Sequence, residues 1–310
     1  MVIPLIVDTD PGVDDAVALL VAMGSAEAQL RAVTTVFGNV GLETTTVNAQ
    51  RLLALGGCPD VPLGVGADRP LVYAQPNRAA DVHGADGLGG LAGTLPAPAA
   101  PPDRRGAVEL IADVLRAADA PVTIAAIGPL TNVALLLSVH PSLASRIGRL
   151  VVMGGALAGG NTTPVAEFNV WSDPEAAHRV LVEERLPTTL VPLDLTHRTW
   201  MDGAWLAALA RSGERGATMA AVLEHPRGRW RASTGQDGVV LHDAVAVLEA
   251  AVPGTLRTTP LPLDVVCGYG PARGLVIADR RGVTGGRVVD VALDADLGAL
   301  RAEILRRVTA

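Results

Sequence analysis

Four carboxylates lie within eight residues near the start of the chain, in the stretch Asp8-Thr9-Asp10-Pro11-Gly12-Val13-Asp14-Asp15. Some of them could simply cap a helix, because aspartate is a good N-cap residue and acids in a first turn complement the helix dipole. Capping uses one or two of them, whereas four carboxylates this close together repel one another and need a countercharge. A hard cation bound through oxygen atoms supplies one. The spacing therefore favours a metal site.

The residues on either side place these acids at the end of a strand. Residues 2–7 form a short apolar run, which predicts a buried strand. Pro11 and Gly12 interrupt the run, and residues 16–23 predict a helix. An open parallel sheet binds its ligands at the carboxyl ends of its strands, where the chain passes into the following helices. The acidic stretch therefore lies where such a sheet would hold a ligand.

Apolar strand-like runs alternate with helical patterns along most of the chain, which predicts an α/β fold. We expect an open, mostly parallel sheet that is covered by helices. Pro62 makes residues 61–65 typical of an edge strand. No internal repeat and no linker divides the sequence, so residues 1–310 are interpreted as a single domain. The expected strands are residues 2–7, 31–37, 61–65, 122–127, 149–153, 188–193, 274–278 and 287–293, and the expected helices include residues 16–23, 43–55, 106–118, 204–211, 219–223 and 242–251.

The composition excludes several classes of protein. With 49% hydrophobic and 18% charged residues, the chain is globular rather than disordered. Its formal net charge is −7 and its arginines form no basic run, which argues against binding to nucleic acid. The sequence contains neither an apolar run of about 18 residues, as a membrane span needs, nor an N-terminal leader pattern. Cys58 and Cys267 fit buried thiols in a reducing compartment, so we expect a cytoplasmic protein that does not associate with membranes.

Polar residues follow several of the expected strands. Asn39 follows the second strand, and Asn161, Glu167 and Asn169 follow the strand at residues 149–153. The carboxyl ends of parallel strands lie on one edge of a sheet, so these side chains can converge although they are distant in sequence. Taken alone, each asparagine could equally be a turn or cap residue.

The stretch from Asp8 to Ala16 resembles the N-terminal signature of the inosine-uridine-preferring nucleoside hydrolases, and further segments similar to that family follow in order to about residue 255. The resemblance implies the Rossmann-like nucleoside hydrolase fold and hydrolysis of ribonucleosides to ribose and free base. It also implies one Ca²⁺ on the floor of the pocket, held by Asp10, Asp15, the backbone carbonyl of Ile127 and Asp243. Many relatives carry threonine at the position of Ile127, a change that a backbone ligand tolerates. The residues expected to contact the substrate sugar are Asp14, Asn39, Met153, Asn161, Glu167 and Asn169.

Cleavage of an N-glycosidic bond leaves a sugar with oxocarbenium character, so a water molecule must be activated and the base must be helped to leave. We interpret Asp10 as the base that takes the proton of the water. His242 precedes a metal-ligand aspartate, and an imidazole with a pKa of about 6.5 suits proton transfer. In the inosine-uridine and pyrimidine branches of the family, the matching histidine helps to protonate the base.

Three other aromatic or imidazole side chains are candidates for contacts with the substrate. His83 matches a family histidine that contacts the ligand, and it lies in a glycine-rich loop at about residues 73–93, which we expect to be a mobile lid. Trp230 lies in an arginine-rich stretch and could stack on the base, although surface packing is equally compatible. His197 belongs to a recurrent segment and its role is open.

Two other classes of function are also compatible with parts of the sequence. A Mg²⁺-dependent phosphotransferase of the haloacid dehalogenase type also begins with a strand followed by Asp-x-Asp, but that chemistry usually needs a later lysine and the chain has none. A non-catalytic protein that binds Ca²⁺ or sugar would keep the metal ligands without needing His242. The histidines favour an enzyme that accepts purines and pyrimidines or prefers pyrimidines. Relatives are commonly homodimers or homotetramers, so we expect a homo-oligomer.

Overall fold

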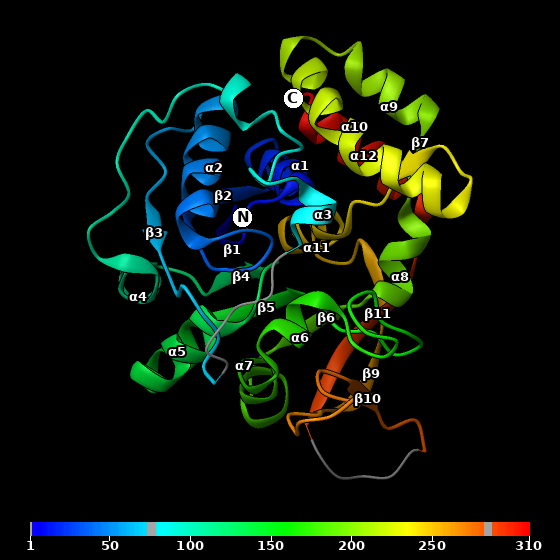
Figure 1. The fold of residues 1–310 in the computed structure, drawn as a ribbon. Coiled ribbons are helices and arrows are strands. Elements are labelled where there is room, and N and C mark those ends of the chain that lie inside the picture. Colours follow the sequence, from blue (N-terminus) through cyan, green and yellow to red (C-terminus); the bar gives the residue numbers. More distant parts are fainter. Residues whose placement is uncertain (1, 73–78, 282–286) are drawn as a thin grey trace.

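The computed structural model describes residues 2–72, 79–281 and 287–310 (Figure 1). The strands are β1 (Ile3–Thr9), β2 (Ala28–Thr35), β3 (Leu63–Val65), β4 (Val122–Ala126), β5 (Ile147–Met153), β6 (Thr188–Val191), β7 (Met201–Asp202), β8 (Gly238–Val239), β9 (Leu256–Val265), β10 (Val276–Ala278) and β11 (Val288–Ala295). Within the described ranges, nine of them form one sheet in the order β10-β9-β11-β6-β5-β4-β1-β2-β3. The strands from β11 to β3 are parallel, and β9 is antiparallel to both of its neighbours. The expected mostly parallel α/β sheet is confirmed.

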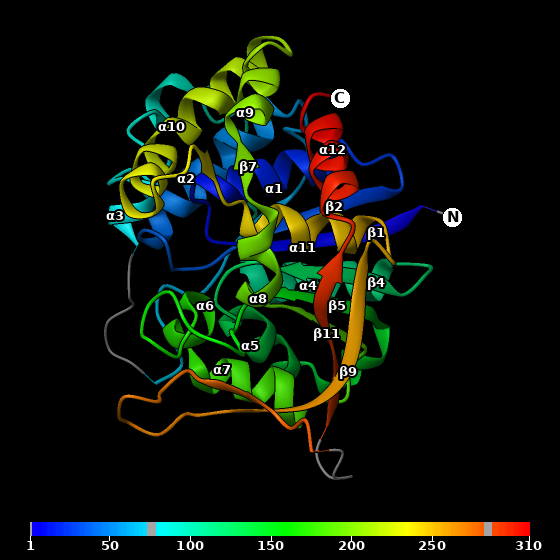
Figure 2. The ribbon, with the colours of Figure 1, turned by 90° about the vertical axis from the view of Figure 1, so that its right-hand side faces the viewer.

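Helices cover both faces of this sheet, as the two perpendicular views show (Figure 2). They are α1 (Val13–Met23), α2 (Leu42–Leu55), α3 (Ala80–His83), α4 (Gly106–Ala117), α5 (Thr131–Val139), α6 (Phe168–Ser172), α7 (Pro174–His178), α8 (Leu193–Thr196), α9 (Gly203–Ala210), α10 (Glu214–Thr234), α11 (His242–Ala251) and α12 (Leu297–Val308). Successive side chains of β1 point to opposite faces. Leu5 and Val7 join a core with α1, α2, α10, α11 and α12, whereas Ile6 joins a second core with α4, α5 and α7. Strand β1 is thus buried on both sides.

Helix α10 is much longer than the helix expected at residues 219–223, because it continues through Pro226. A proline inside a helix removes the N–H that would bond to the carbonyl four residues earlier, here that of Val222. The loop after α3 approaches this carbonyl at Gly89, where an added Cβ would lie 3.0 Å from the oxygen of Val222. Gly89 also has a φ of +66°, which favours glycine.

Strand β9 is not among the expected strands, and it contains Pro260 and Pro262, which are unusual inside a sheet. The structure accommodates these prolines through incomplete pairing. Strand β10 pairs only with Leu263–Val265 of β9, so Pro260 lies outside that pairing and faces β11 on one side alone. The expected edge strand is confirmed, since β3 pairs with β2 at the end of the sheet.

Part of the expected lid, residues 73–78, lies outside the described residues. The described part contains α3 and a turn organised by Asp86, whose carboxylate accepts hydrogen bonds from the backbone N–H groups of Leu88, Gly90 and Ala92 at 3.0, 2.8 and 2.8 Å. Asn48 of α2 donates to the carbonyls of Pro11 and Asp86 at 3.1 and 2.9 Å. The loop is therefore tied to the acidic stretch.

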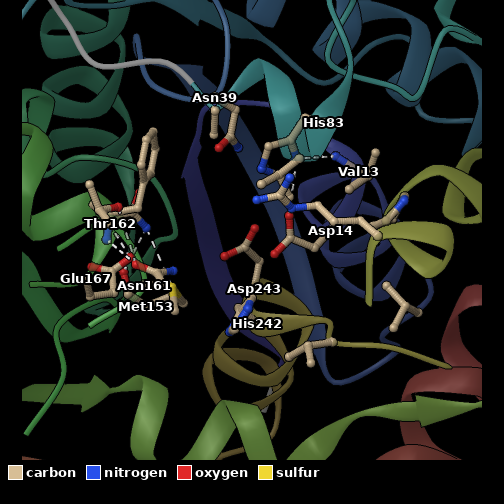
Figure 3. A pocket seen from close by; sticks show the side chains of 18 of the residues that line it. Val13, Asp14, Asn39, His83, Met153, Asn161, Thr162, Glu167, His242 and Asp243 are labelled. Carbon is tan, nitrogen blue, oxygen red and sulfur yellow. Dashed lines mark hydrogen bonds and ion pairs between the residues drawn. The ribbon is translucent and has the colours of Figure 1, made fainter. Parts of the chain in front are cut away.

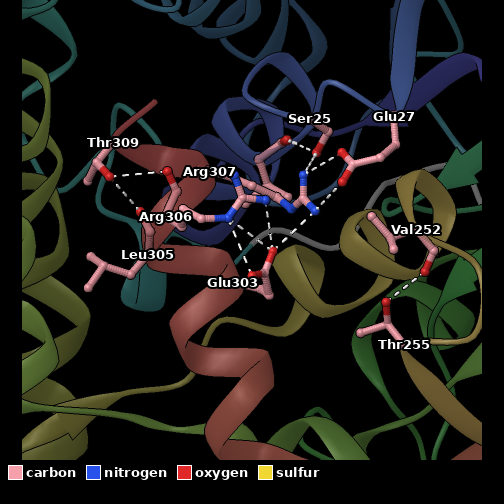
Figure 4. Close-up of polar contacts among 10 residues, drawn as sticks. Ser25, Glu27, Val252, Thr255, Glu303, Leu305, Arg306, Arg307 and Thr309 are labelled. Carbon is pink, nitrogen blue, oxygen red and sulfur yellow. Dashed lines mark hydrogen bonds and ion pairs between the residues drawn. The ribbon is translucent and has the colours of Figure 1, made fainter. Parts of the chain in front are cut away.

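The C-terminal helix α12 is attached to the segment after α1 by Arg307 (Figure 4). This side chain is 3% exposed and donates to both carboxylate oxygens of Glu27, at 2.8 and 3.0 Å, and to Ser25 at 3.2 Å. Glu303 of the same helix lies 3.2 Å from the guanidinium. In the part of the chain that is described, no helix is both long and apolar enough to span a bilayer.

Candidate active site

The acids of the N-terminal stretch divide into structural and pocket-facing groups. Asp8 is fully buried, and its carboxylate accepts hydrogen bonds from Thr34 of β2 at 2.6 Å and Asn132 of α5 at 2.8 Å. It therefore joins the strands below the pocket. Asp15 accepts hydrogen bonds from the Thr9 hydroxyl at 2.5 Å and from the backbone N–H of Gly12 at 2.9 Å. It therefore caps α1, which is the role considered above as the alternative to metal binding. Capping accounts for this one acid, and neither role explains Asp10 or Asp14.

Three carboxylates from two helices converge on the floor of a pocket. Asp14 and Asp15 lie in the first turn of α1, Asp243 lies in the first turn of α11, and one oxygen of each lies within 4.8 Å of the others. Asp14 and Asp243 point toward one another (Figure 3). Burial, with repulsion from Asp15, raises the pKa of Asp14 to about 7. Burial and repulsion from the other acids raise the pKa of Asp243 well above its ordinary range.

Asp10 lies beside this cluster in a space that only glycines leave open. A Cβ at Gly38 would lie 1.9 Å from one of its carboxylate oxygens, and a Cβ at Gly128 would lie 2.7 Å from the other. Its Oδ2 accepts the backbone N–H of Asn39 at 2.8 Å, whereas its buried Oδ1 has no hydrogen-bond partner among the described residues. Burial, with repulsion from Asp15, raises the pKa of Asp10 well above its usual value.

These observations fit a bound metal ion. A cation would relieve the repulsion among the buried carboxylates and would satisfy an oxygen that lacks a partner. The cluster offers oxygen atoms and no sulfur, as hard cations such as Ca²⁺ prefer. Ile127 lines the same pocket, and its carbonyl accepts a hydrogen bond from Asn169 at 2.8 Å while keeping a second lone pair.

The connection from β5 to α6 supplies the opposite side of the pocket (Figure 3). Glu167 caps α6, accepting the backbone N–H groups of Gly155, Asn169 and Val170 at 2.8, 2.8 and 3.1 Å. Burial nevertheless raises its pKa. Asn169 also donates to the carbonyl of Met153 at 3.2 Å. Asn161 is exposed at the rim, where its Oδ1 accepts the N–H of Phe168 at 3.0 Å.

Two histidines reach the pocket from other elements. Nδ1 of His83, in α3, accepts the backbone N–H of Val13 at 3.1 Å and lies 3.9 Å from Asp14. Nδ1 of His242, the first residue of α11, lies 2.7 Å from the hydroxyl of Thr196. Burial lowers the pKa of both rings to about 3, below the value of about 6.5 expected for His242. His197 also lines the pocket, with its ring centroid 5.4 Å from that of His242.

Helix α10 closes the remaining side. Trp230 lines the pocket, and its buried Nε1 lacks a hydrogen-bond partner in the part of the chain that is described. Pro226, Arg229 and Ser233 line it too. Sequence reasoning missed these three, although the spacing of 226, 229, 230 and 233 is that of one helix face. A proline is unusual inside a helix, so local patterns do not predict a helix that continues through Pro226.

Every residue expected in the site except Asp10 and Asp15 lines one cavity of about 290 Å³, and those two acids lie directly below it. A cavity of this size suits a small ligand. Its floor is acidic and fits a metal ion. One wall carries amide groups and a carboxylate, and the other carries imidazole and indole rings. Such an arrangement can hold a polyol on the acidic side and a planar ring on the aromatic side.

Comparisons with known proteins show what the chain is similar to. A profile of the family described as inosine-uridine preferring nucleoside hydrolase matches residues 5–302. The pyrimidine-specific ribonucleoside hydrolase RihA of Salmonella enteritidis PT4 is 38% identical over 293 residues, covering 93% of this chain and 92% of that enzyme. The structure of the plant nucleoside hydrolase PpNRh1 superposes with a TM-score of 0.92 at 31% identity, covering 99% of both chains. That of the purine-preferring ribonucleoside hydrolase from Gardnerella vaginalis gives 0.92 at 28% identity, covering 99% of this chain and 98% of that one.

The fold is therefore that of a nucleoside hydrolase, an enzyme that cleaves ribonucleosides. More particularly, the chain belongs to the inosine-uridine-preferring nucleoside hydrolase family. The phosphotransferase alternative is not supported. Its nucleophile would be Asp8, which is fully buried, bonded to Thr34 and Asn132 and absent from the pocket lining.

Proposed function

We propose that this enzyme hydrolyses the N-glycosidic bond of ribonucleosides in a Ca²⁺-dependent reaction that gives ribose and a free purine or pyrimidine base. The observation that carries the proposal is the meeting of the buried Asp14, Asp15 and Asp243 with the sugar-sized wall of Glu167 and Asn169 in one pocket. The pyrimidine-specific name of the RihA relative favours uridine and cytidine as preferred substrates.

Asp10 is the residue we propose to take a proton from the attacking water. Its Oδ2 is occupied by the N–H of Asn39, which fixes the orientation of the carboxylate and leaves Oδ1 available. When bound, Ca²⁺ supplies positive charge that makes the water easier to deprotonate. Asp15, Asp243 and the carbonyl of Ile127 are the other proposed ligands. The carboxylate of Asp14 joins Asp15 and Asp243 in the cluster, so it could also contribute an oxygen.

The wall opposite the acids is proposed to grip the ribose. Asn169 is fixed by its hydrogen bonds to Ile127 and Met153, so its amide presents a defined orientation to the sugar. Glu167, Asn161, Asn39 and Met153 complete the proposed sugar contacts. A rigid wall positions the anomeric carbon for attack, which lowers the entropic part of the barrier.

The base is proposed to leave toward His242, His83 and Trp230. His242 would stabilise the departing base through a hydrogen bond from its N–H or by proton transfer. His83 would contact the same ligand. Trp230 would stack on the base, because its indole lies in the pocket wall.

A substrate panel tests the proposal. Uridine, cytidine, inosine and adenosine are incubated with the enzyme, and released ribose is detected as reducing sugar, before and after chelation and with Ca²⁺, Mg²⁺ or Zn²⁺ restored. We expect ribose release that chelation abolishes and Ca²⁺ restores. Metal binding without ribose release from any nucleoside would favour a non-catalytic binding protein. Full activity after removal of all metal would overturn the Ca²⁺ dependence.

The homodimer or homotetramer and the cytoplasmic location stay predictions. Light scattering of the purified chain gives the oligomeric state directly. Fractionation of the source cells gives the location.

A further inference from the structure

Thr196, which ends α8, places a hydroxyl against the proposed leaving-group histidine. It is fully buried, and its Oγ1 lies 2.7 Å from Nδ1 of His242. Among the described residues, the hydroxyl has no other hydrogen-bond partner, and Nε2 of His242 has none either. The ring is partly exposed and lines the pocket, so Nε2 is the nitrogen available to a ligand.

This contact selects one tautomer of the ring. A hydroxyl is both a donor and an acceptor, so the short contact alone allows either direction. If His242 carried its proton on Nδ1, the buried hydroxyl hydrogen of Thr196 would have no acceptor in the described part of the chain, and an unsatisfied buried donor is costly. If the hydroxyl donates to Nδ1 instead, both the buried hydroxyl and Nδ1 have a partner, and Nε2 faces the pocket. The neutral ring then carries its proton on Nε2.

His83 offers an independent example in the same pocket. Its Nδ1 lies 3.1 Å from the backbone nitrogen of Val13. A backbone N–H can only donate, so Nδ1 of a neutral His83 is an acceptor and the proton lies on Nε2. His83 thus has a protein donor at Nδ1, as we infer for His242.

We propose that Thr196 is a positioning residue that holds His242 in the Nε2–H tautomer, so that the ring presents an N–H donor to the departing base. This inference rests on the proposed function. As the glycosidic C–N bond breaks, the base keeps the electron pair and the oxygen of water bonds to the sugar carbon. The water proton goes to Asp10, and the hydrogen bond from Nε2 stabilises the negative charge on the base until solvent protonates it.

The test compares Thr196→Val with Thr196→Ser and with Thr199→Val. Valine keeps the shape of threonine and removes the hydroxyl, whereas serine keeps the hydroxyl. Thr199 is a matched control, because it is fully buried in the next turn and its hydroxyl donates to the carbonyl of Thr196 at 2.7 Å without touching His242. Each variant is assayed on uridine and on 4-nitrophenyl riboside, whose leaving group is stable as an anion.

We expect Thr196→Val to lower kcat on uridine about 10- to 100-fold, a loss of the size seen when the outer partner of a metal-binding histidine is removed. The rate on the nitrophenyl substrate should be unchanged. Thr196→Ser should restore the uridine rate, and Thr199→Val should match the wild type on both substrates. Equal losses on both substrates, or the same selective loss in Thr199→Val, would overturn the proposal.

A spectroscopic measurement identifies the tautomer of His242 without an activity assay. Two-bond ¹H–¹⁵N spectra of protein with ¹⁵N-labelled histidine report which ring nitrogen carries the proton, and His242→Gln assigns the signal. We expect Nε2–H for His242 in the wild type and a mixture of tautomers in Thr196→Val. An Nδ1–H ring in the wild type would overturn the role of Thr196 even if nucleosides are hydrolysed. If wild type releases no ribose, the proposed function fails while the tautomer is still measured.

Discussion

The backbone N–H of Asn39 donates to Oδ2 of Asp10 at 2.8 Å, and the side-chain amide of the same residue donates to the Asp10 carbonyl at 3.1 Å. The amide also reaches Asp15, at 3.0 Å. One residue from the end of β2 therefore fixes two acids from the end of β1 and the start of α1. Parallel pairing of β1 with β2 makes this possible, because it brings their carboxyl ends together.

Replacement of Asp10 by asparagine should abolish hydrolysis and leave the fold intact. Asparagine can still accept the N–H of Asn39, but it cannot take a proton from water. We therefore expect kcat to fall by about 100-fold or more. Removal of one buried charge from the acidic floor relieves repulsion, so the melting temperature of the metal-free protein should not fall. Ribose release and thermal unfolding measure the two effects. Full activity in the variant would show that another group is the base.

Removal of the imidazole in His242→Ala should affect substrates according to their leaving groups. Uracil and hypoxanthine leave poorly as anions, and acid or hydrogen-bond assistance is worth about 10²–10⁴-fold. A nitrophenyl leaving group needs little assistance. We therefore expect a large loss on uridine and inosine and a small loss on nitrophenyl riboside, whereas Asp10→Asn should damage both. Equal losses in the histidine variant would reassign His242 to binding, and full activity would point to His83.

Ligand should protect the glycine-rich loop. We propose that residues 73–93 close over the ribose, and the turn around Asp86 gives the described part a defined conformation to close with. Hydrogen exchange or limited proteolysis is measured with and without a ribose analogue, with the exposed turn at Gly213 as an internal control. Equal exchange in both states would argue against a lid.

The ion pair between Glu27 and Arg307 should make stability depend on pH in the acid range. The hydrogen bond from Arg307 lowers the pKa of Glu27 from its ordinary 4.5 to about 2 in the folded state. Its contribution is therefore complete above about pH 4.5 and disappears as the pH falls toward about 2. Glu27→Gln should have a lower melting temperature than wild type at pH 6, and the difference should vanish near pH 2. Glu43→Gln, at a position away from Arg307, is the control. A difference that is independent of pH would contradict the ion pair.

Local patterns in the sequence predicted much of the fold, and they failed at prolines. Strand β1 and its acids were predictable because an apolar run ends in carboxylates within a few residues. Pro260 and Pro226 concealed β9 and most of α10, since both elements tolerate proline only through tertiary context. Strand β10 stops short of Pro260, and Gly89 packs against the turn that Pro226 interrupts.

The candidate site was also predictable only in part from local patterns in the sequence. Asp14 and Asp15 follow from local spacing, but their meeting with Asp243 could be anticipated only through the family resemblance. The contact between Thr196 and His242 joins residues 46 positions apart through one hydroxyl. No periodicity in the sequence reports a contact of this kind, because it depends on how α8 and α11 pack.

The close approach of Gly89 to the turn of α10 around Val222 joins two parts of the enzyme that would otherwise be treated separately. The loop that carries His83 packs against the helix that carries Trp230, and both side chains line the same pocket. We therefore expect a base that moves this helix to move the loop as well. On that expectation, the rate of product release differs between bases, and substrate preference arises from product release as well as from chemistry.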